Sequence, residues 1–260
     1  MIALHYALIA SVLSAVLAPL ANPTSSRAET SAKLKPPALC SELAKGQDRE
    51  PDETRSYVVL VNDTDVGTEV FQYWITNDHV QVNVTTTLEG SVFGIISIAQ
   101  KHCRKESWKA KGGKPIDLIH SYSATNNANI FLQDTRISLY PRPDGAGYSY
   151  ESEDGERTQV ADTASTVSVT TPLLAMREGQ LVDVFEYRIY DDVKVSKESS
   201  IIPGTEQFRL SGDLDRLLWF KEGHHTLLRL CGKERFGVVI ETRHEDVLEN
   251  DLAPCVSLFR

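Results

Sequence analysis

A long succession of β-strand patterns, separated by tight turns, constrains the fold of this chain more than any other feature. The clearest strand is 80–85, where three valines alternate with polar residues, as expected for a strand with one buried face. Residues 62–65, NDTD, form a typical turn sequence, because Asn and Asp tolerate left-handed backbone. About eleven or twelve such strands, with one short helix at 172–177, predict a mainly β protein. We expect a single antiparallel meander whose strongly curved sheet forms a half-barrel or barrel.

Two short sequences are expected to interrupt strands. Glu89 and Gly90 are predicted to end the strand that begins at Val80, because glycine weakens a strand. Asp191 and Asp192 are predicted to form a turn.

The first twenty residues have the pattern of an export signal. Residues 2–20 are almost all apolar, and Ser26 and Ala28 place small residues before a possible cleavage site at Glu29. An uncleaved membrane anchor is the alternative, since an apolar run of about 20 residues can span a bilayer. With cleavage, we expect a periplasmic or secreted protein without a stable membrane span. The predicted division is a signal peptide at 1–28, a polar linker at 29–54, an antiparallel β domain at 55–243 and a C-terminal tail at 244–260.

The net negative charge of the chain argues against nucleic acid as a partner. Cleavage removes Arg27 and no acidic residue, leaving 26 basic against 36 acidic side chains, a net charge of −10. Such a surface repels phosphate backbones, so we expect no nucleic-acid partner. It also argues against binding to anionic lipid headgroups through charge.

Four cysteines lie after the export segment, at Cys40, Cys103, Cys231 and Cys255. An even number of cysteines in an oxidising compartment indicates two disulfides, and four cysteines allow three pairings. We favour Cys40 with Cys255, because both lie near the ends of the chain, and Cys103 with Cys231, because both lie in strand-like runs. The absence of a C-x-x-C sequence argues against a redox or metal site.

The opening strands resemble a known group of proteins. The run from Tyr57 to Thr68, YVVLVNDTDVGT, is similar to the Y-x-V-x-V-N-G-x-x-V-G hairpin of an uncharacterised bacterial exported family. Later family features, an E-x-W strand and an L-W-Y/F strand, match 106–108 and 218–220. The chain departs from the pattern at Asp63, where the family has glycine.

This resemblance would cover about 57–242. It implies a distant architectural likeness to half-barrel periplasmic proteins, some of which carry lipids or lipoproteins on their concave face. The family has no assigned activity, so the resemblance implies no catalytic residues.

One long strand, at 94–108, contains the main candidate binding residues. Its first half is apolar and its second half is charged, so we expect it to leave the core and run to a solvated edge. His102, Arg104, Glu106 and Trp108 share one face of this strand. They are either a polar binding row or ion-paired residues on a solvated face, and we favour the second interpretation. Trp219, in the L-W-F sequence, is a further candidate binding residue.

No sequence pattern indicates catalysis, a metal or a cofactor. The pair at 224–225 places adjacent histidines on opposite faces of a strand, and the acidic run at 151–156 fits no calcium loop. We therefore do not favour an enzyme. The preferred hypothesis is a soluble periplasmic binding or carrier module for an apolar small molecule or lipid. The alternatives are a structural or protein-interaction domain of the cell envelope without a ligand pocket and, least favoured, a hydrolase without a recognisable motif.

Overall fold

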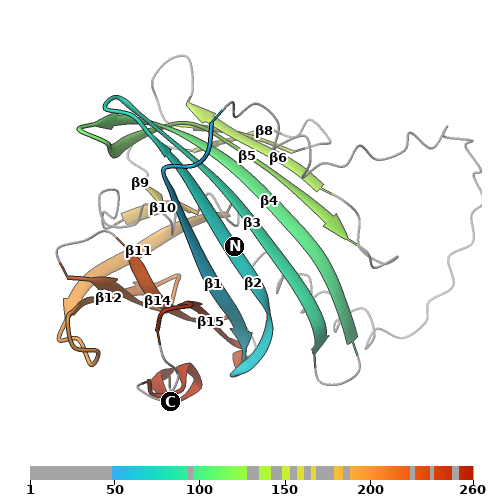
Figure 1. Ribbon diagram of the computed structural model, residues 1–260, viewed down its shortest axis with the longest axis vertical. Coiled ribbons are helices and arrows are strands. Elements are labelled where there is room, and N and C mark those ends of the chain that lie inside the picture. Colours follow the sequence, from blue (N-terminus) through green and yellow to red (C-terminus); the bar gives the residue numbers. More distant parts are fainter. Residues whose placement is uncertain are drawn as a thin grey trace, which may run out of the picture.

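The computed structural model describes residues 49–92, 96–127, 135–141, 148–152, 157–160, 165–167, 179–183, 188–222, 226–234, 237–247 and 252–259. These residues form fifteen strands and one short 3-10 helix, η3 (Figure 1). The predicted signal peptide, Cys40 and the predicted helix at 172–177 lie outside the described residues. The elements are β1 (Glu53–Val61), β2 (Thr64–Ile75), β3 (His79–Val92), β4 (Ile96–Lys111), β5 (Lys114–Asn127), β6 (Thr135–Pro141), β7 (Tyr148–Ser152), β8 (Arg157–Val160), β9 (Ser165–Val167), β10 (Gly179–Asp183), β11 (Arg188–Glu198), β12 (Thr205–Gly212), β13 (Arg216–Lys221), β14 (Leu227–Lys233), β15 (Val239–His244) and η3 (Cys255–Phe259).

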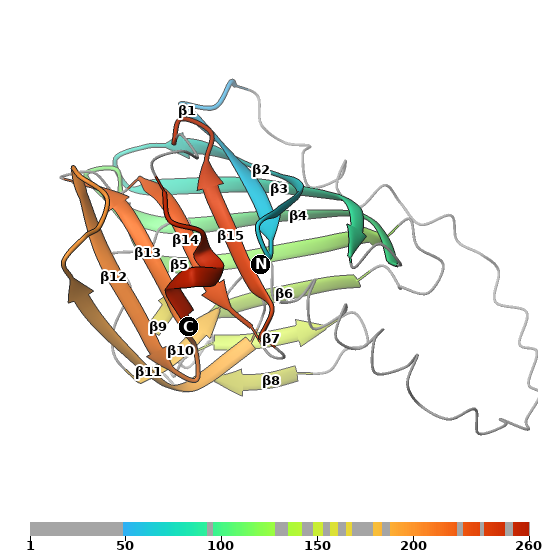
Figure 2. The same ribbon diagram turned by 90° about the horizontal axis from the view of Figure 1, so that it is seen from below.

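All fifteen strands belong to one sheet, with the order β8-β7-β6-β5-β4-β3-β2-β1-β15-β14-β13-β12-β11-β10-β9. Within β1–β8 and within β9–β15, neighbours along the chain are neighbours in the sheet, and β1 pairs with β15 to join the two halves. The consecutive strands β8 and β9 lie at the two ends of the strand order. Each described pair is antiparallel except β9 with β10, which is parallel. Figure 2 shows β11 to β15 lying across the layer formed by β2 to β7. The predicted antiparallel meander in one strongly curved sheet is therefore confirmed.

Turn chemistry explains how the first strands follow one another. Asn62 and Asp63 have φ of 47° and 64°, which is the left-handed backbone that a two-residue hairpin turn between β1 and β2 requires. Gly112 and Gly113, with φ of 59° and 75°, make the same kind of connection between β4 and β5.

Two predicted interruptions are wrong. Gly90 lies inside β3, where it pairs with Ile98 of β4. Because of this pairing, the strand continues through the glycine to Val92. Asp191 and Asp192 lie inside β11 rather than in a turn. They lie at a register shift between β10 and β11, where their backbone N–H groups both donate to Asp213 Oδ2, at 2.9 and 3.1 Å.

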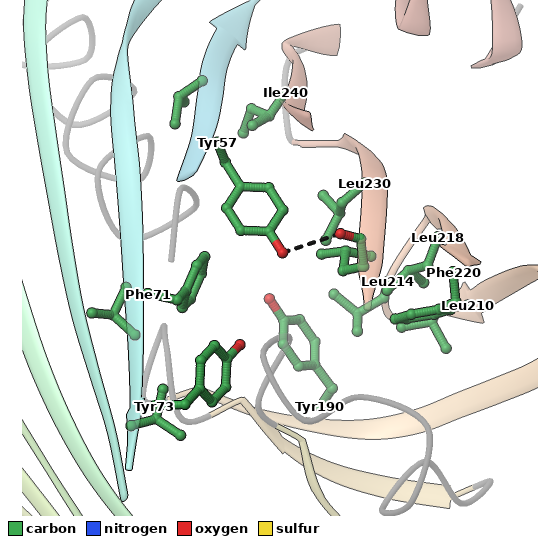
Figure 3. Close-up of a cluster of buried hydrophobic side chains, with 14 of the residues drawn as sticks. Tyr57, Phe71, Tyr73, Tyr190, Leu210, Leu214, Leu218, Phe220, Leu230 and Ile240 are labelled. Carbon is green, nitrogen blue, oxygen red and sulfur yellow. Dashed lines mark hydrogen bonds between the residues drawn. The ribbon is translucent and has the colours of Figure 1, made fainter. Parts of the chain in front are cut away.

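Alternation along the strands separates two apolar clusters on opposite faces of the sheet. The larger cluster lies on the inner face and combines residues of β1–β5 with residues of the facing wall, β11–β15 (Figure 3). The smaller cluster lies on the outer face of β13–β15, where η3 covers it. Its buried members are Leu217, Trp219, Cys231, Val239 and Cys255.

One disulfide fixes the C-terminal segment, and it differs from the predicted pairing. Cys231 of β14 is bonded to Cys255 of η3, with the two Cα atoms 5.6 Å apart. The predicted pairs Cys103–Cys231 and Cys40–Cys255 are therefore wrong. The reason is distance: β4 and β14 are five strands apart, about 24 Å along the sheet, whereas bonded cysteines have Cα atoms within about 7 Å. Cys103 is also disulfide-bonded.

Within the described part of the chain, no helix is both long enough and apolar enough to cross a membrane.

Candidate binding site on the inner face of the sheet

The four candidate residues of β4 lie on the inner face of the sheet and are buried. His102 and Glu106 are 0 % exposed, and Arg104 and Trp108 are each 1 % exposed. The predicted solvated edge is thus wrong for this strand. The physical reason is the sheet order, because β5 to β8 continue the sheet beyond β4 and leave it far from an edge.

Strand register places further buried polar residues beside these four. His102 lies opposite Thr86 of β3 and Thr125 of β5, and Thr86 lies opposite Glu69 of β2. The next two rows place a serine of β5 opposite Arg104 and another opposite Glu106. Together these side chains form what we call the polar sector: Glu69, Thr86, His102, Arg104, Glu106, Ser121, Ser123 and Thr125, all exposed by 3 % or less.

An ion pair lies at the centre of the polar sector. Arg104 Nε is 2.6 Å from Glu106 Oε1, and both side chains are 0 % exposed. The indole of Trp108 donates a hydrogen bond of 2.9 Å to the other carboxylate oxygen, Glu106 Oε2. Both oxygens of Glu106 are therefore engaged from its own strand.

A second group of polar contacts crosses β2 to β5. Thr86 Oγ1 donates to Glu69 Oε1 at 2.8 Å, and His102 Nδ1 lies 2.8 Å from Thr125 Oγ1. Burial raises the pKa of Glu69 to about 7, against the lowering effects of the Thr86 hydrogen bond and of the positive charge on Arg104. This carboxyl group therefore changes its protonation state near neutral pH.

Aromatic side chains form the boundary between the polar sector and the apolar part of the inner face. Figure 3 shows Tyr57, Phe71 and Tyr73 pointing toward Tyr190 of the facing wall. The Tyr57 hydroxyl donates to the Leu227 carbonyl oxygen at 3.1 Å, which links β1 to the opposite wall. Burial raises the pKa of Tyr57 and of Tyr73, so both hydroxyls keep their protons.

Trp219 does not join this group. Its side chain lies on the outer face, in the cluster under η3, and its indole donates to Gln207 Oε1 at 2.8 Å. The Arg229 guanidinium lies 5.4 Å from the centre of the Trp219 ring. The sequence prediction therefore combined two tryptophans that the fold places on opposite faces of the sheet.

Sequence reasoning missed five residues of the polar sector: Glu69, Thr86, Ser121, Ser123 and Thr125. The available signal was parity: Glu69 has the same parity as Phe71 and Tyr73, so it had to share their face. The polar sector places hydrogen-bond donors and acceptors beside the buried apolar cluster of the inner face. Among the described residues, no group of three or more His, Cys, Asp or Glu side chains is arranged to hold a metal ion.

Comparison with known proteins gives a similarity of fold. A search of protein families finds no match, and a search of curated proteins finds no similar sequence. A solved structure that is similar to this chain is the β-barrel-like protein of the domain of unknown function DUF1849 from Brucella abortus. The alignment has a TM-score of 0.50 and 6 % identity, and it covers 74 % of this chain and 94 % of that chain. The similarity shows a shared barrel-like architecture, as expected for the curved meander described above.

Proposed function

We propose that this protein is a binding or carrier module that holds an amphipathic ligand, such as a lipid, on the inner face of its curved sheet. The observation that carries the proposal is the polar sector lying beside the apolar inner wall. Binding sites for small molecules combine mostly apolar walls with a few placed polar groups, which is the composition of this face.

A purely structural interior gives a weaker account of the same residues. Burying Arg104 and Glu106 removes two charges from water, and apolar residues of similar volume are often at least as stabilising as such a pair. Burying these polar groups therefore costs stability. This cost favours a second role for them, such as orienting the polar end of a ligand.

Export supports the same proposal. The apolar N-terminal pattern predicts a signal peptide, and the oxidised Cys231–Cys255 pair suits an oxidising compartment. We therefore place the proposed binding function in the periplasm or outside the cell.

The three tryptophans provide a test that reports position. Trp108 lies on the inner face, whereas Trp74, whose indole donates to the Arg49 carbonyl, and Trp219 lie on the outer face. A brominated monoacylglycerol, whose bromine atoms quench tryptophan fluorescence at short range, should quench the wild-type protein. The Trp108→Phe variant, with both outer tryptophans retained, should show little quenching.

Equal quenching in the two proteins, or none in either, would overturn the proposal. Native mass spectrometry of protein purified from the cell envelope gives an independent measurement, since a bound lipid adds its mass. A structural or protein-interaction domain of the envelope, the second candidate function, predicts neither quenching nor added mass.

A further inference from the structure

Arg104 of the polar sector is already paired with Glu106, and this ion pair limits the ligand. We propose that the polar end of the bound ligand is uncharged and carries hydroxyl or amide groups, and that the site discriminates against anionic lipids. This inference rests on the binding function proposed above and names the class of ligand for the same site.

The cation of the sector already has an anionic partner. Arg104 Nε lies 2.6 Å from Glu106 Oε1, and Trp108 donates to the second oxygen of the same carboxylate. A phosphate or carboxylate of a ligand would have to displace Glu106 from Arg104. Glu106 would then remain buried without its counter-ion, which is strongly unfavourable in a low-dielectric interior.

The remaining acidic group also opposes an anion. Glu69 is 3 % exposed, and its carboxylate accepts a hydrogen bond from Thr86. In its ionised form it repels a second negative charge, and in its protonated form it attracts none. An ammonium head gains little from Glu106, which Arg104 already holds. The cost of removing the ammonium from water in this buried site offsets its attraction to an ionised Glu69.

Hydroxyl groups suit an uncharged polar head better. Ser121, Ser123 and Thr125 of β5 are each 3 % exposed or less and lie opposite the charged residues of β4. A hydroxyl can donate one hydrogen bond and accept others, so these residues can exchange partners with a ligand hydroxyl or amide without moving a charge.

Ligands with the same chain and different heads test this inference. Monooleoylglycerol and oleoyl lysophosphatidic acid differ by one phosphate group, and oleylamine supplies a cationic head on a similar chain. Each competes against the brominated monoacylglycerol, with recovery of Trp108 fluorescence as the readout. We expect monooleoylglycerol to bind at least about tenfold more tightly than either charged ligand.

A charge variant gives the reverse expectation. Glu106→Gln keeps an acceptor for the Trp108 indole and removes the counter-ion of Arg104, so lysophosphatidic acid should gain at least about tenfold relative to monooleoylglycerol. Glu222→Gln, at an exposed position after β13, is the matched control and should leave the ratio unchanged.

Tighter or equal binding of lysophosphatidic acid by the wild-type protein would overturn the inference and leave the binding function standing. A probe that never quenches Trp108 would overturn the binding function, and the inference with it. Circular dichroism shows whether Glu106→Gln folds. If it does not fold, the comparison of the three ligands on wild-type protein decides alone.

Discussion

The ion pair between Arg229 and Glu241 should stabilise the attachment of η3 to the outer face. Arg229 Nε donates to Glu241 Oε1 at 3.0 Å, and the two side chains are 1 % and 4 % exposed. Arg229 Nη2 also donates to the Ala253 carbonyl oxygen at 2.8 Å, just before η3. Arg243 Nη1 lies 3.6 Å from the same Glu241 oxygen, so one carboxylate balances two guanidinium groups. We expect Glu241→Met to be strongly destabilising, because it removes the counter-ion of the buried Arg229 and one ionic contact of Arg243.

The size of the effect follows from burial. Removing one partner of a buried ion pair costs about 3–5 kcal/mol in free energy of unfolding. For a domain of this size each kcal/mol lowers Tm by about 2–4 °C, so Glu241→Met should lower Tm by about 6–20 °C. Arg229→Met should cost less, since Glu241 keeps Arg243 as a partner. The double variant Arg229→Met/Glu241→Met should recover much of the loss, because the buried Arg229 is removed together with its counter-ion and Arg243, whose side chain is 11 % exposed, loses a longer contact of 3.6 Å.

Thermal and urea denaturation, followed by circular dichroism, measure these differences. The matched control is Glu206→Met, which removes an ion pair with Lys197 whose side chains are 61 % and 30 % exposed for Lys197 and Glu206. That exposed pair should contribute less than about 1 kcal/mol. The reasoning fails if Arg229→Met is more destabilising than Glu241→Met, or if the double variant is less stable than both single variants.

Three further predictions concern stability. Replacing Cys231 and Cys255 together by Ala should lower the free energy of unfolding, measured in urea, by about 3–4 kcal/mol. This is the loss expected for a disulfide that closes a loop with a sequence separation of 24. An unchanged free energy of unfolding would contradict the prediction. Burial raises the pKa of Glu69 from 4.5 to about 7, so the folded protein holds a proton that the unfolded chain releases. The free energy of unfolding should therefore fall by on the order of 3 kcal/mol as pH rises from about 4.5 to about 7. The Glu69→Gln variant should lose this part of the pH dependence. A rise in stability contributed by Glu69 over that range would refute the prediction. Gly212→Ala, at φ +99°, places a Cβ in steric conflict with the backbone carbonyl oxygen of Asp192 in β11. Thermal melts should show a larger loss of stability than the cost of about 1–2 kcal/mol for Gly112→Ala, which has open space at φ +59°.

Local sequence was sufficient for much of the fold. The turn at Asn62 and Asp63 was predictable because few residues accept left-handed backbone, and alternation from Val80 to Val84 fixed which side chains share a face. Gly90 and the aspartates of β11 were predicted wrongly for the opposite reason. At Gly90, pairing with β4 overrides a weak local preference. Asp191 and Asp192 lie at a register shift between β10 and β11, and Asp213 accepts hydrogen bonds from both of their N–H groups. Neither β4 nor Asp213 is visible in a short window of sequence around these residues.

Disulfide pairing also depended on contacts that are distant along the chain. Cys103 and Cys231 both lie in strands, as predicted, but pairing of β1 with β15 separates their strands by most of the central sheet. The bond from Cys231 instead reaches a short helix only 24 residues away, which the outer face of β13 to β15 positions through its apolar cluster.

For the candidate site, too, the sequence predicted which side chains share a face of the strand but not whether that face is buried. Parity predicted correctly that His102, Arg104, Glu106 and Trp108 share one face, but charge alone suggested that this face meets water. Two non-local features reverse that conclusion: β5 to β8 extend the sheet past β4, and β11 to β15 form the opposite wall of the interior. Charged side chains on an exposed strand are solvated by water. The same side chains in an interior lose that solvation, so each charge requires a compensating interaction. Here Glu106 supplies the counter-ion of Arg104, and this ion pair makes an uncharged ligand the better fit for the site.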